Sequence, residues 1–378
     1  MQLELVECGL STAFAPTLAK TLTERVEWRS AFFANGSFID RSFRPQLCAF
    51  RNNHAVSSLD ERATELLREA IDDFVARLRI SDSTTRLRGQ SAALALVLPE
   101  VDEDQGLSRT RLTDLGKILC NQISEAMAAE LDLRIERQTI RASGHAGVGS
   151  VLTDDVAMTE NAKWLLVVAV DSYSDGLRLN GLNDDGRLFS KETQFGFIPG
   201  EAAGILLLAP ENGNRWSDEA LAARFTLRGT GESIEPVTER QEDETLFNAM
   251  SDSALAACEM AFGKSGGRQI SHWYADWNNN RYRATELSFA IHRANSFFLK
   301  EQLEPIYPAL QFGDTGAAYG ALALCLARSD LDGKARRTGE GEVQEASTFD
   351  VSYALISAGS TIRGLRSALV VSRSSVLP

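Results

Sequence analysis

Cysteine is scarce and scattered in this 378-residue sequence. The five cysteines are odd in number, lie far apart and are mostly set in apolar runs, without a CxxC pair. This pattern excludes a disulfide framework and a zinc site built from paired cysteines. We expect buried thiols in a reducing cytoplasm, and neither a metal ion nor a cofactor.

Excess positive charge and long apolar runs are also lacking. The net charge of −13 disfavours binding to nucleic acid or to an anionic membrane, since both attract basic patches. No window approaches the ~20 apolar residues that span a bilayer, and the N-terminus has no basic stretch followed by an apolar one. We therefore expect a soluble cytoplasmic protein.

What the sequence does contain is enough apolar material for a sizeable core, 44% of all residues. Residues 3–10 have the character of a strand, and residues 17–28 have the spacing of a helix. A clear amphipathic helix follows at 59–78, then a buried strand at 92–98 and a second amphipathic helix at 112–131. This alternation predicts an α/β layered fold.

Two apolar runs, 164–170 and 202–209, have the length and β-branched content of strands buried on both faces, and we expect them to be neighbours. After a break at 210–216 a second series of elements begins. Its expected elements are a strand at 224–229, helices at 243–262, 283–300 and 316–328, and strands at 269–276, 350–358 and 366–372. The order of elements predicts two similar halves, 1–210 and 211–378, and the charged stretch 329–347 is expected to be an exposed loop.

The segment that leads into the second apolar strand resembles one in the β-ketoacyl synthases of the thiolase superfamily. There a Pro-Gly-Glu-Gly-Ala-Gly stretch precedes an apolar strand, and here the stretch from Pro199 to Gly204 differs by one residue, Ala202. Small residues in such a turn let the backbone pack closely against a neighbour.

Two further runs resemble the segments that carry the histidines of this family. The run 313–320 looks like Gly-His-x-x-Gly-Ala-Ala-Gly, with Asp314 at the histidine position. The run 272–280 resembles a strand that ends in His-Gly-Thr-Gly-Thr, with Asp276 at its histidine. The family's lysine, five residues before the second histidine, falls on Ala309.

The position of the family's nucleophile falls within residues 142–147, where no cysteine occurs. The best match places Gly144 at the reactive cysteine, with Ser143 and His145 on either side. In the family, a cysteine at a helix N-terminus takes the acyl group, and two imidazoles stabilise the enolate oxygen. Glycine cannot accept an acyl group, and an aspartate would face a developing anion.

The resemblance therefore implies a thiolase-like fold with a degenerate active site. We expect two similar α/β halves stacked in five layers, αβαβα, with mixed sheets. Family members pair through the edge strand near the nucleophile, which implies a homodimer, or a heterodimer with a relative. The apolar run 164–170 is expected to lie near that interface.

The polar residues of these segments allow several interpretations. Ser143 and His145 could serve a residual acyltransferase or hydrolase, and Asp276 and Asp314 could converge as a carboxylate pair. Alternatively, both aspartates are replacements tolerated after catalysis was lost, with Asp314 capping the helix that follows it. A polar cluster follows the strand at 269–276. It either forms an ordinary turn or lines a pocket, which would be formed by Asn278, Asn280 and Arg281.

The leading hypothesis is an inactive accessory protein that acts by binding other proteins. Its sequence resembles stand-alone thiolase-like proteins of bacterial type VI secretion gene clusters, which implies an adaptor or loading partner for a secretion effector or component. The alternative is a subunit like a chain-length factor, which lacks the cysteine and works beside a ketosynthase and an acyl carrier protein.

Overall fold

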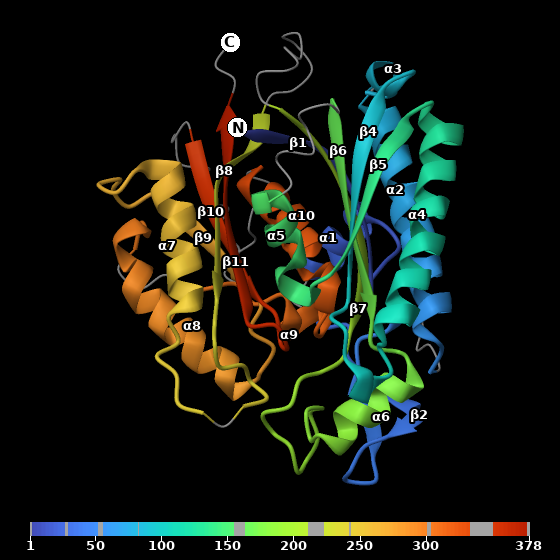
Figure 1. Ribbon diagram of the computed structural model, residues 1–378, viewed down its shortest axis with the longest axis vertical. Helices are drawn as coiled ribbons and strands as arrows, with labels where there is room; N and C mark the ends of the chain where they lie inside the picture. The colour runs from blue at the N-terminus through green and yellow to red at the C-terminus, as the bar shows by residue number, and fades with distance from the viewer. Residues whose placement is uncertain are drawn as a thin grey trace.

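The structure is a computed structural model, and it describes residues 2–26, 29–51, 56–81, 83–154, 163–210, 223–241, 243–300, 304–332 and 351–375. Two sheets with helices between and outside them form five layers (Figure 1). This arrangement confirms the predicted fold class.

The first sheet is built from the N-terminal part of the chain in the order β5-β4-β6-β7-β1. Parallel pairing joins β4 to β5 and to β6, whereas β7 is antiparallel to both of its neighbours. The predicted pairing of the two apolar runs is confirmed, because Val168 of β6 lies opposite Ile205 of β7. These strands are β1 (Leu3–Thr12), β4 (Ser91–Leu98), β5 (Arg134–Ala142), β6 (Trp164–Ser172) and β7 (Glu201–Pro210).

The second sheet comes from the C-terminal part in the order β8-β11-β10-β9, and only β9 and β10 are parallel. A short antiparallel contact, Leu3 opposite Leu227, joins β1 to β8, so that the two sheets are continuous over nine strands. The strands are β8 (Ala223–Ile234), β9 (Ile270–Ala275), β10 (Val351–Gly359) and β11 (Leu365–Ser375).

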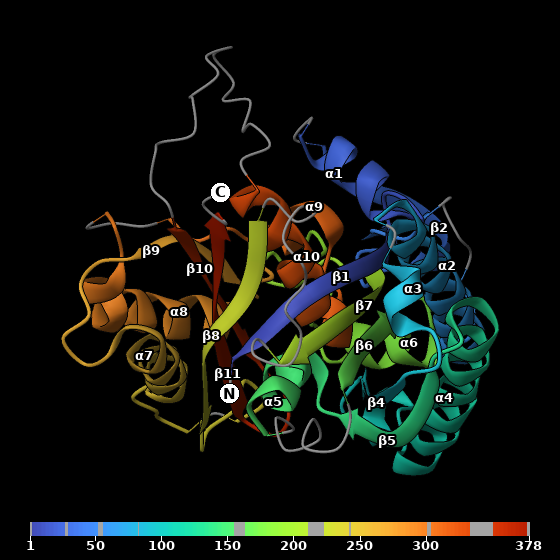
Figure 2. The ribbon, with the colours of Figure 1, turned by 90° about the horizontal axis from the view of Figure 1, so that it is seen from above.

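The helices occupy three of the five layers. Helices α2 and α4 cover the outer face of the first sheet, α7 and α8 cover that of the second, and α5 and α10 lie between the sheets (Figures 1 and 2). Shorter helices and the hairpin of β2 (Phe33–Ile39) and β3 (Pro45–Cys48) complete the fold. The helices are α1 (Leu18–Val26), α2 (Leu59–Ile80), α3 (Thr84–Leu87), α4 (Arg109–Leu131), α5 (Gly147–Asp154), α6 (Gly176–Asp184), α7 (Ala249–Phe262), α8 (Arg281–Ala294), α9 (Ala309–Phe312) and α10 (Tyr319–Leu331).

Helix α2 illustrates how local sequence and burial agree. The hydroxyl of Ser58 accepts a hydrogen bond from the Glu61 N–H at 3.3 Å and so caps the helix. Asp60 and Glu61 lie in the first turn, where the helix dipole favours negative charge. The apolar stripe that the sequence predicts is buried against β1, β6 and β7.

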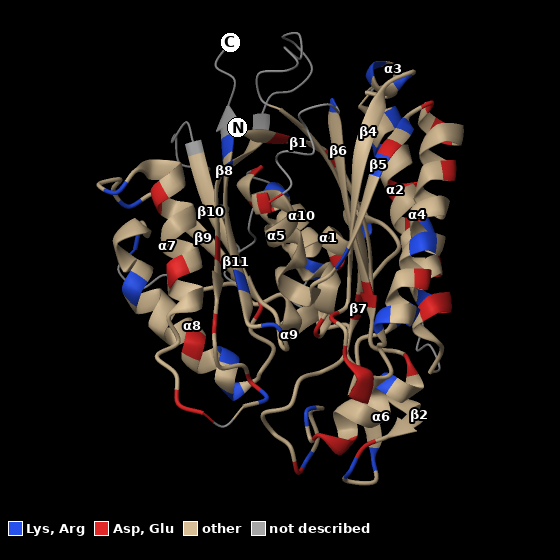
Figure 3. Cartoon of the chain, viewed as in Figure 1, with Lys and Arg blue, Asp and Glu red and all other residues tan. Residues whose placement is uncertain are grey.

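The hydrophobic core has three main parts. One cluster lies between the first sheet and its outer helices, and a second lies between the other sheet and α7 and α8. The largest surrounds α5 and α10 and takes residues from both sheets. Charged residues lie mostly on the outer helices and around the lower end of the sheets, and fewer lie on the helices of the central layer (Figure 3).

Several expectations about single elements need correction. Strand β6 is interior, between β4 and β7, and the edge of the first sheet belongs to β5, which the sequence did not predict because its residues are largely polar. Helix α7 begins at Ala249 and not at 243, and α6 was not predicted. The expected loop 329–347 lies mostly outside the described residues, after α10 ends at Leu331. Among the described helices, none is long and apolar enough to cross a membrane.

Candidate functional site

The predicted positions meet at the end of the sheets where parallel strands terminate. Within each sheet, the carboxyl ends of parallel strands share an edge, which is where α/β proteins commonly place functional side chains. Glu100 follows β4, Gly144 follows β5, and Asp171 lies near the end of β6. From the second sheet, Asp276 follows β9 and the turn 360–364 follows β10.

Asp314 lies at the centre of the site and is almost completely buried. Its Oδ1 atom is 2.7 Å from Nε2 of His145, and it accepts hydrogen bonds from the Tyr173 hydroxyl at 3.2 Å and the Gly316 N–H at 2.8 Å. The side-chain amide of Asn278 donates to Oδ2. Burial alone would raise the pKa of Asp314, but His145, Arg283 and Asn278 outweigh burial and hold that pKa well below its usual range.

Asp276 has a different partner, the buried guanidinium of Arg283. Nη1 of Arg283 donates to Oδ2 of Asp276 at 2.8 Å, and the same oxygen accepts the Gly359 N–H at 2.7 Å. Arg283 also donates to the carbonyl of Gly359 and to the Thr361 hydroxyl, and its Nε lies 3.6 Å from Glu239. Burial disfavours the charged form, but Asp276, Glu239 and Asp314 raise the pKa of Arg283 above its ordinary value.

Arg283 links the two aspartates without bringing them into contact. Its Nη2 atom lies 3.5 Å from Nδ1 of His145, whose Nε2 faces Asp314. The order of groups is therefore Asp276, Arg283, His145, Asp314. The structure does not bring the two carboxylates together as an interacting pair. Among the described residues, no group of three or more histidines, cysteines and carboxylates is placed to hold a metal ion.

Gly144 occupies the turn between β5 and α5 with a φ of +60°, a conformation that side chains disfavour. A Cβ added there would lie 2.9 Å from Cγ of Glu100, so that Glu100 already fills the space above the glycine. The Glu100 carboxylate accepts hydrogen bonds from three successive backbone N–H groups, those of residues 361, 362 and 363. Three N–H groups on one turn form an anion-binding concavity, and here it holds a side chain of the same protein.

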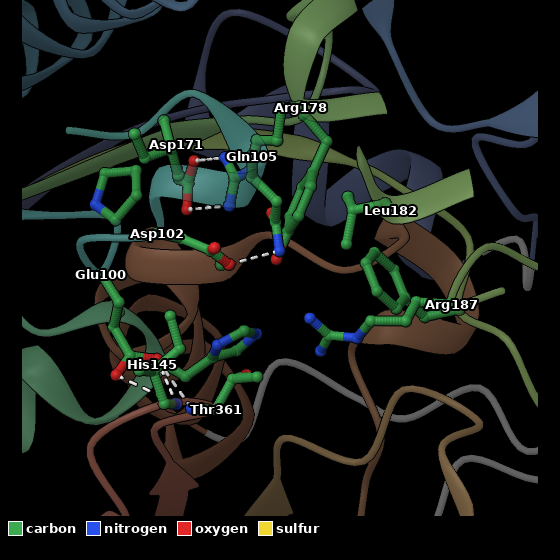
Figure 4. A pocket seen from close by; sticks show the side chains of 16 residues that line it. Glu100, Asp102, Gln105, His145, Asp171, Arg178, Leu182, Arg187 and Thr361 are labelled. Carbon is green, nitrogen blue, oxygen red and sulfur yellow. Dashed lines mark hydrogen bonds and ion pairs between the residues drawn. The ribbon is translucent and has the colours of Figure 1, made fainter. Parts of the chain in front are cut away.

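A small polar cavity of about 30 Å³ lies beside this turn, between the two sheets. His145 and Arg187 point toward each other across it (Figure 4). Arg178 lies on its wall with its guanidinium 3.6 Å from the centre of the Tyr173 ring, and it is paired with Asp171. Burial disfavours the charged form of Arg178, but Asp171 outweighs burial and raises its pKa.

The remaining predicted residues are distributed as follows. Ser143 is buried, and its Oγ has no hydrogen-bond partner. Asn280 caps α8 through the N–H groups of Tyr282 and Arg283, and Arg281 stacks on the exposed ring of Phe195. Asn278 donates to Asp314, and none of these three residues lines the cavity. Ala309 begins α9 and lies outside the cavity.

Sequence reasoning missed Glu100, Asp171, Arg178 and Arg187. One signal was available for the two carboxylates, because each closely follows or ends an apolar strand, and β4 and β6 are parallel neighbours. Arg178 lies in α6 and Arg187 follows it, in a segment for which no helix was predicted, and no spacing in the sequence links them to the site.

No protein-family model matches the sequence, and a comparison with curated protein sequences finds no match. Solved structures do resemble it. The ketosynthase from module 6 of the bacillaene synthase of Bacillus subtilis 168 has a TM-score of 0.73 at 13% identity, covering 100% of this chain and 73% of that chain.

Two complexes also contain a similar chain. One is a ketosynthase with its chain length factor from Xenorhabdus doucetiae, with a TM-score of 0.65 and 14% identity over 98% of this chain and 97% of that one. The other is a type II polyketide synthase acyl-carrier protein with its ketosynthase bound to the hexaketide, with a TM-score of 0.70 and 12% identity over 98% of each chain. The chain therefore has the thiolase-like fold of the ketosynthases, and identities this low establish the fold alone.

Proposed function

We propose that this chain is a non-condensing, ketosynthase-like protein that acts by binding other proteins. The observation that carries the proposal is the turn at Gly144. That position has no side chain, its φ disfavours one, and Glu100 fills the space that a nucleophile would occupy. A covalent acyl intermediate needs a nucleophilic side chain at an accessible position, so the geometry argues against acyl transfer at residue 144.

The charges around the turn lead to the same conclusion. Condensation develops negative charge on an oxygen, and enzymes stabilise it with donors or cations aimed at that point. Here the backbone donors of residues 361–363 are already bound to Glu100, and Arg283 is bound to Asp276 and near Glu239. A cavity of about 30 Å³ is also far smaller than the ~300–1,000 Å³ of ordinary ligand pockets.

We propose two alternative kinds of partner, one in type VI secretion and one in a ketosynthase complex. The type VI secretion setting rests on the resemblance of the runs 276–280 and 313–318, and its partner would be a secretion effector or component. The ketosynthase setting draws support from the two complexes above, in which a similar chain is found with a chain length factor or an acyl-carrier protein. We also keep as proposals the division into halves 1–210 and 211–378 and a homodimer through β5, which has a strand neighbour on only one side among the described strands.

The first test asks whether the protein takes an acyl group at all. Purified protein would be incubated with acetyl and longer acyl thioesters of coenzyme A, and its intact mass measured. We expect no acyl adduct, and none either in the Gly144→Cys variant, because Glu100 would still crowd the new thiol. An adduct on the unmodified protein, mapped to Ser143 or to a cysteine, would refute the proposal.

The second test identifies the partner. Tagged protein would be purified from its native host under mild salt, with an Asp314→Ala variant and an untagged strain as controls. Recovery of a secretion effector or tip component supports the adaptor, and recovery of a ketosynthase or acyl carrier protein supports the subunit like a chain-length factor. Light scattering on the same preparation gives the mass of the assembly, and a monomer without a partner contradicts both settings.

One observation favours a second candidate, a residual acyltransferase or hydrolase. Asp314 holds the imidazole of His145 at 2.7 Å in the manner of the acid that orients the base in a catalytic triad, and Ser143 Oγ is unpartnered. Ser143 Oγ makes no hydrogen bond to His145 in the structure. Hydrolysis of p-nitrophenyl esters that is abolished in Ser143→Ala and retained in the control Ser150→Ala would favour this candidate.

A further inference from the structure

A groove of about 500 Å³ lies between the β2–β3 hairpin and the loop that follows α6, at the lower end of the fold (Figure 1). None of its lining residues belongs to the cavity of the candidate site, which is only about 30 Å³. The volume of the groove lies within the range of ~300–1,000 Å³ that is typical of ligand pockets. Its apolar lining consists of Pro45, Leu47 and Phe189.

Hydrogen bonds hold the two walls of the groove in place. Gln46 is buried, and its Nε2 atom donates to the carbonyl of Phe189 at 3.1 Å, which ties the hairpin to the loop. The N–H of Phe189 donates to the carbonyl of Phe197 at 2.9 Å. Further along the loop, the side-chain amide of Asn279 donates to the carbonyl of Gln194 at 2.7 Å. The groove is therefore preformed, as binding sites usually are.

The charged residues of the groove favour an anionic ligand. Arg44 lines it from the hairpin and Lys191 from the loop, and neither forms an ion pair with another residue in the described part of the chain. The carboxylate of Asp40 also lines the groove, but its Oδ1 atom accepts the N–H groups of Ser42 and Arg44 at 2.8 and 3.0 Å. The groove thus attracts negative charge, although the whole chain carries a net charge of −13.

An exposed aromatic residue lies next to Arg44 in the hairpin turn. Phe43 is 92% exposed, the highest fraction for any large apolar side chain among the described residues. Its φ of +57° is a conformation that an aromatic residue adopts only at a cost in free energy. The turn is held by hydrogen bonds from the Asp40 N–H to the Arg44 carbonyl and from the Phe43 N–H to the Asp40 carbonyl. The ring buries almost no apolar surface in this chain, whereas exposed aromatic rings are enriched in protein interfaces.

We propose that this groove binds an acidic segment of a partner protein. Carboxylates of the segment pair with Arg44 and Lys191, and its apolar side chains contact the apolar lining. Phe43 packs against the surface of the partner beside the segment. This inference rests on the proposed function, binding to other proteins, and adds to it the docking surface and the chemistry of the partner.

A protein segment fits these observations better than a small molecule or a membrane does. A small anion in the groove would leave the ring of Phe43 exposed, because Phe43 is not among the lining residues. An anionic membrane is recognised by clusters of about 4–8 lysines and arginines, and the groove has only two such residues. A partner protein can contact both the groove and the neighbouring ring.

The first experiment measures binding of a fluorescein-labelled peptide of alternating glutamate and leucine to the full chain, by fluorescence anisotropy at low salt. We expect saturable binding that weakens about tenfold in the double variant Arg44→Glu/Lys191→Glu, because two attractive contacts become repulsive. The matched control is Arg88→Glu/Lys264→Glu, which changes the net charge equally at two other exposed cations and should bind the peptide normally. No saturable binding, or equal weakening in both double variants, would overturn the proposal.

The second experiment uses the partner that is recovered from the native host. Phe43→Ala should unfold in urea like the unmodified protein, because its side chain is exposed, yet recover about tenfold less partner. If Phe43→Ala and Arg44→Glu/Lys191→Glu both recover the partner normally, the groove is not the docking surface, although the proposed function stands. If the unmodified protein recovers no partner, the proposed function fails, and peptide binding tests the groove independently.

Two further measurements test the other occupants. Sedimentation with vesicles of phosphatidylserine and phosphatidylcholine would detect a membrane, and light scattering would detect a second copy of the chain. We expect no difference between the unmodified protein and Arg44→Glu/Lys191→Glu in either measurement. Vesicle binding that is lost in the double variant, or a dimer that dissociates in it, would assign the groove to that occupant and overturn the proposal.

Discussion

Asp314 and Asp276 are both buried at positions where the resemblance places histidines, yet their charges are compensated in different ways. Asp276 is neutralised by a guanidinium that has further acceptors in the 359–361 turn and a second carboxylate nearby. Asp314 is bound by four separate donors, one from its own turn and three from other segments, and none of them is an arginine. The comparison indicates that Asp276 is part of an arginine ion-pair network, whereas Asp314 holds four donors of the candidate site in place.

The largest effect is expected from Asp314→Ala. Removing this carboxylate leaves the side chains of His145, Tyr173 and Asn278 without their acceptor, and we expect a loss of about 3–5 kcal/mol in the free energy of unfolding. Urea denaturation would measure it, with the exposed Asp114→Ala as a control that should change stability by less than about 0.5 kcal/mol. A loss below 1 kcal/mol would mean that the four donors find other acceptors.

A smaller loss is expected from Asp276→Ala. Arg283 keeps the Gly359 carbonyl, Thr361 and the nearby Glu239, so that its charge remains partly compensated. We expect about 1–3 kcal/mol from the unsatisfied groups, measured by the same denaturation experiment. A cost equal to that of Asp314→Ala would remove the distinction between the two aspartates.

The turn at Gly144, between β5 and α5, can be tested through Gly144→Ala. The φ of +60° and the contact with Glu100 predict a loss of about 1–2 kcal/mol. Gly36→Ala is the matched control, because a Cβ there meets nothing within 4 Å. The double variant with Glu100→Ala should cost less than the sum of the two single variants, since the crowding is then relieved, and simple additivity would contradict the contact.

The smallest expected effect is in the acid dependence of stability. The pKa of Asp314 is lowered in the folded protein, so the unfolded chain binds its proton first as the pH falls. Its contribution to stability is therefore present above the unfolded pKa of ~3.9 and is lost at lower pH, by up to about 1.4 kcal/mol per pH unit. Unfolding measured between pH 5 and 3 should show a shallower decline for Asp314→Asn than for the unmodified protein. Parallel curves would assign the acid dependence to other carboxyl groups.

Much of the fold follows from patterns that are local in sequence. Buried strands such as 164–170 and the helix at 59–78 are predictable because an apolar run or stripe must be covered on folding. The strand 134–142 was not predicted, because a polar edge strand lacks both an apolar run and regular alternation of polar and apolar residues. Helix α6 was missed for a related reason, since glycine, asparagine and aspartate dominate a segment that is capped by Asp175 and buried on one side.

The candidate site was predictable only in part. The positions of Gly144, His145 and Asp314 came from short runs with a family resemblance, and they do lie together in the structure. The partners of these residues did not follow from the sequence. Arg283 was not among the predicted site residues, and nothing in the sequence connects Glu100 with a backbone turn more than 250 residues later.

The sequence by itself determined the α/β class, the order of most elements and the absence of a cysteine at the expected nucleophile, because each is encoded by nearby residues. The tertiary structure decided the partner of each buried polar group: Glu100 with the 361–363 turn, Arg283 with Asp276 and His145 with Asp314. The physical reason is that pairing energies depend on burial and on distances of a few ångströms, and both are fixed only when remote segments pack together.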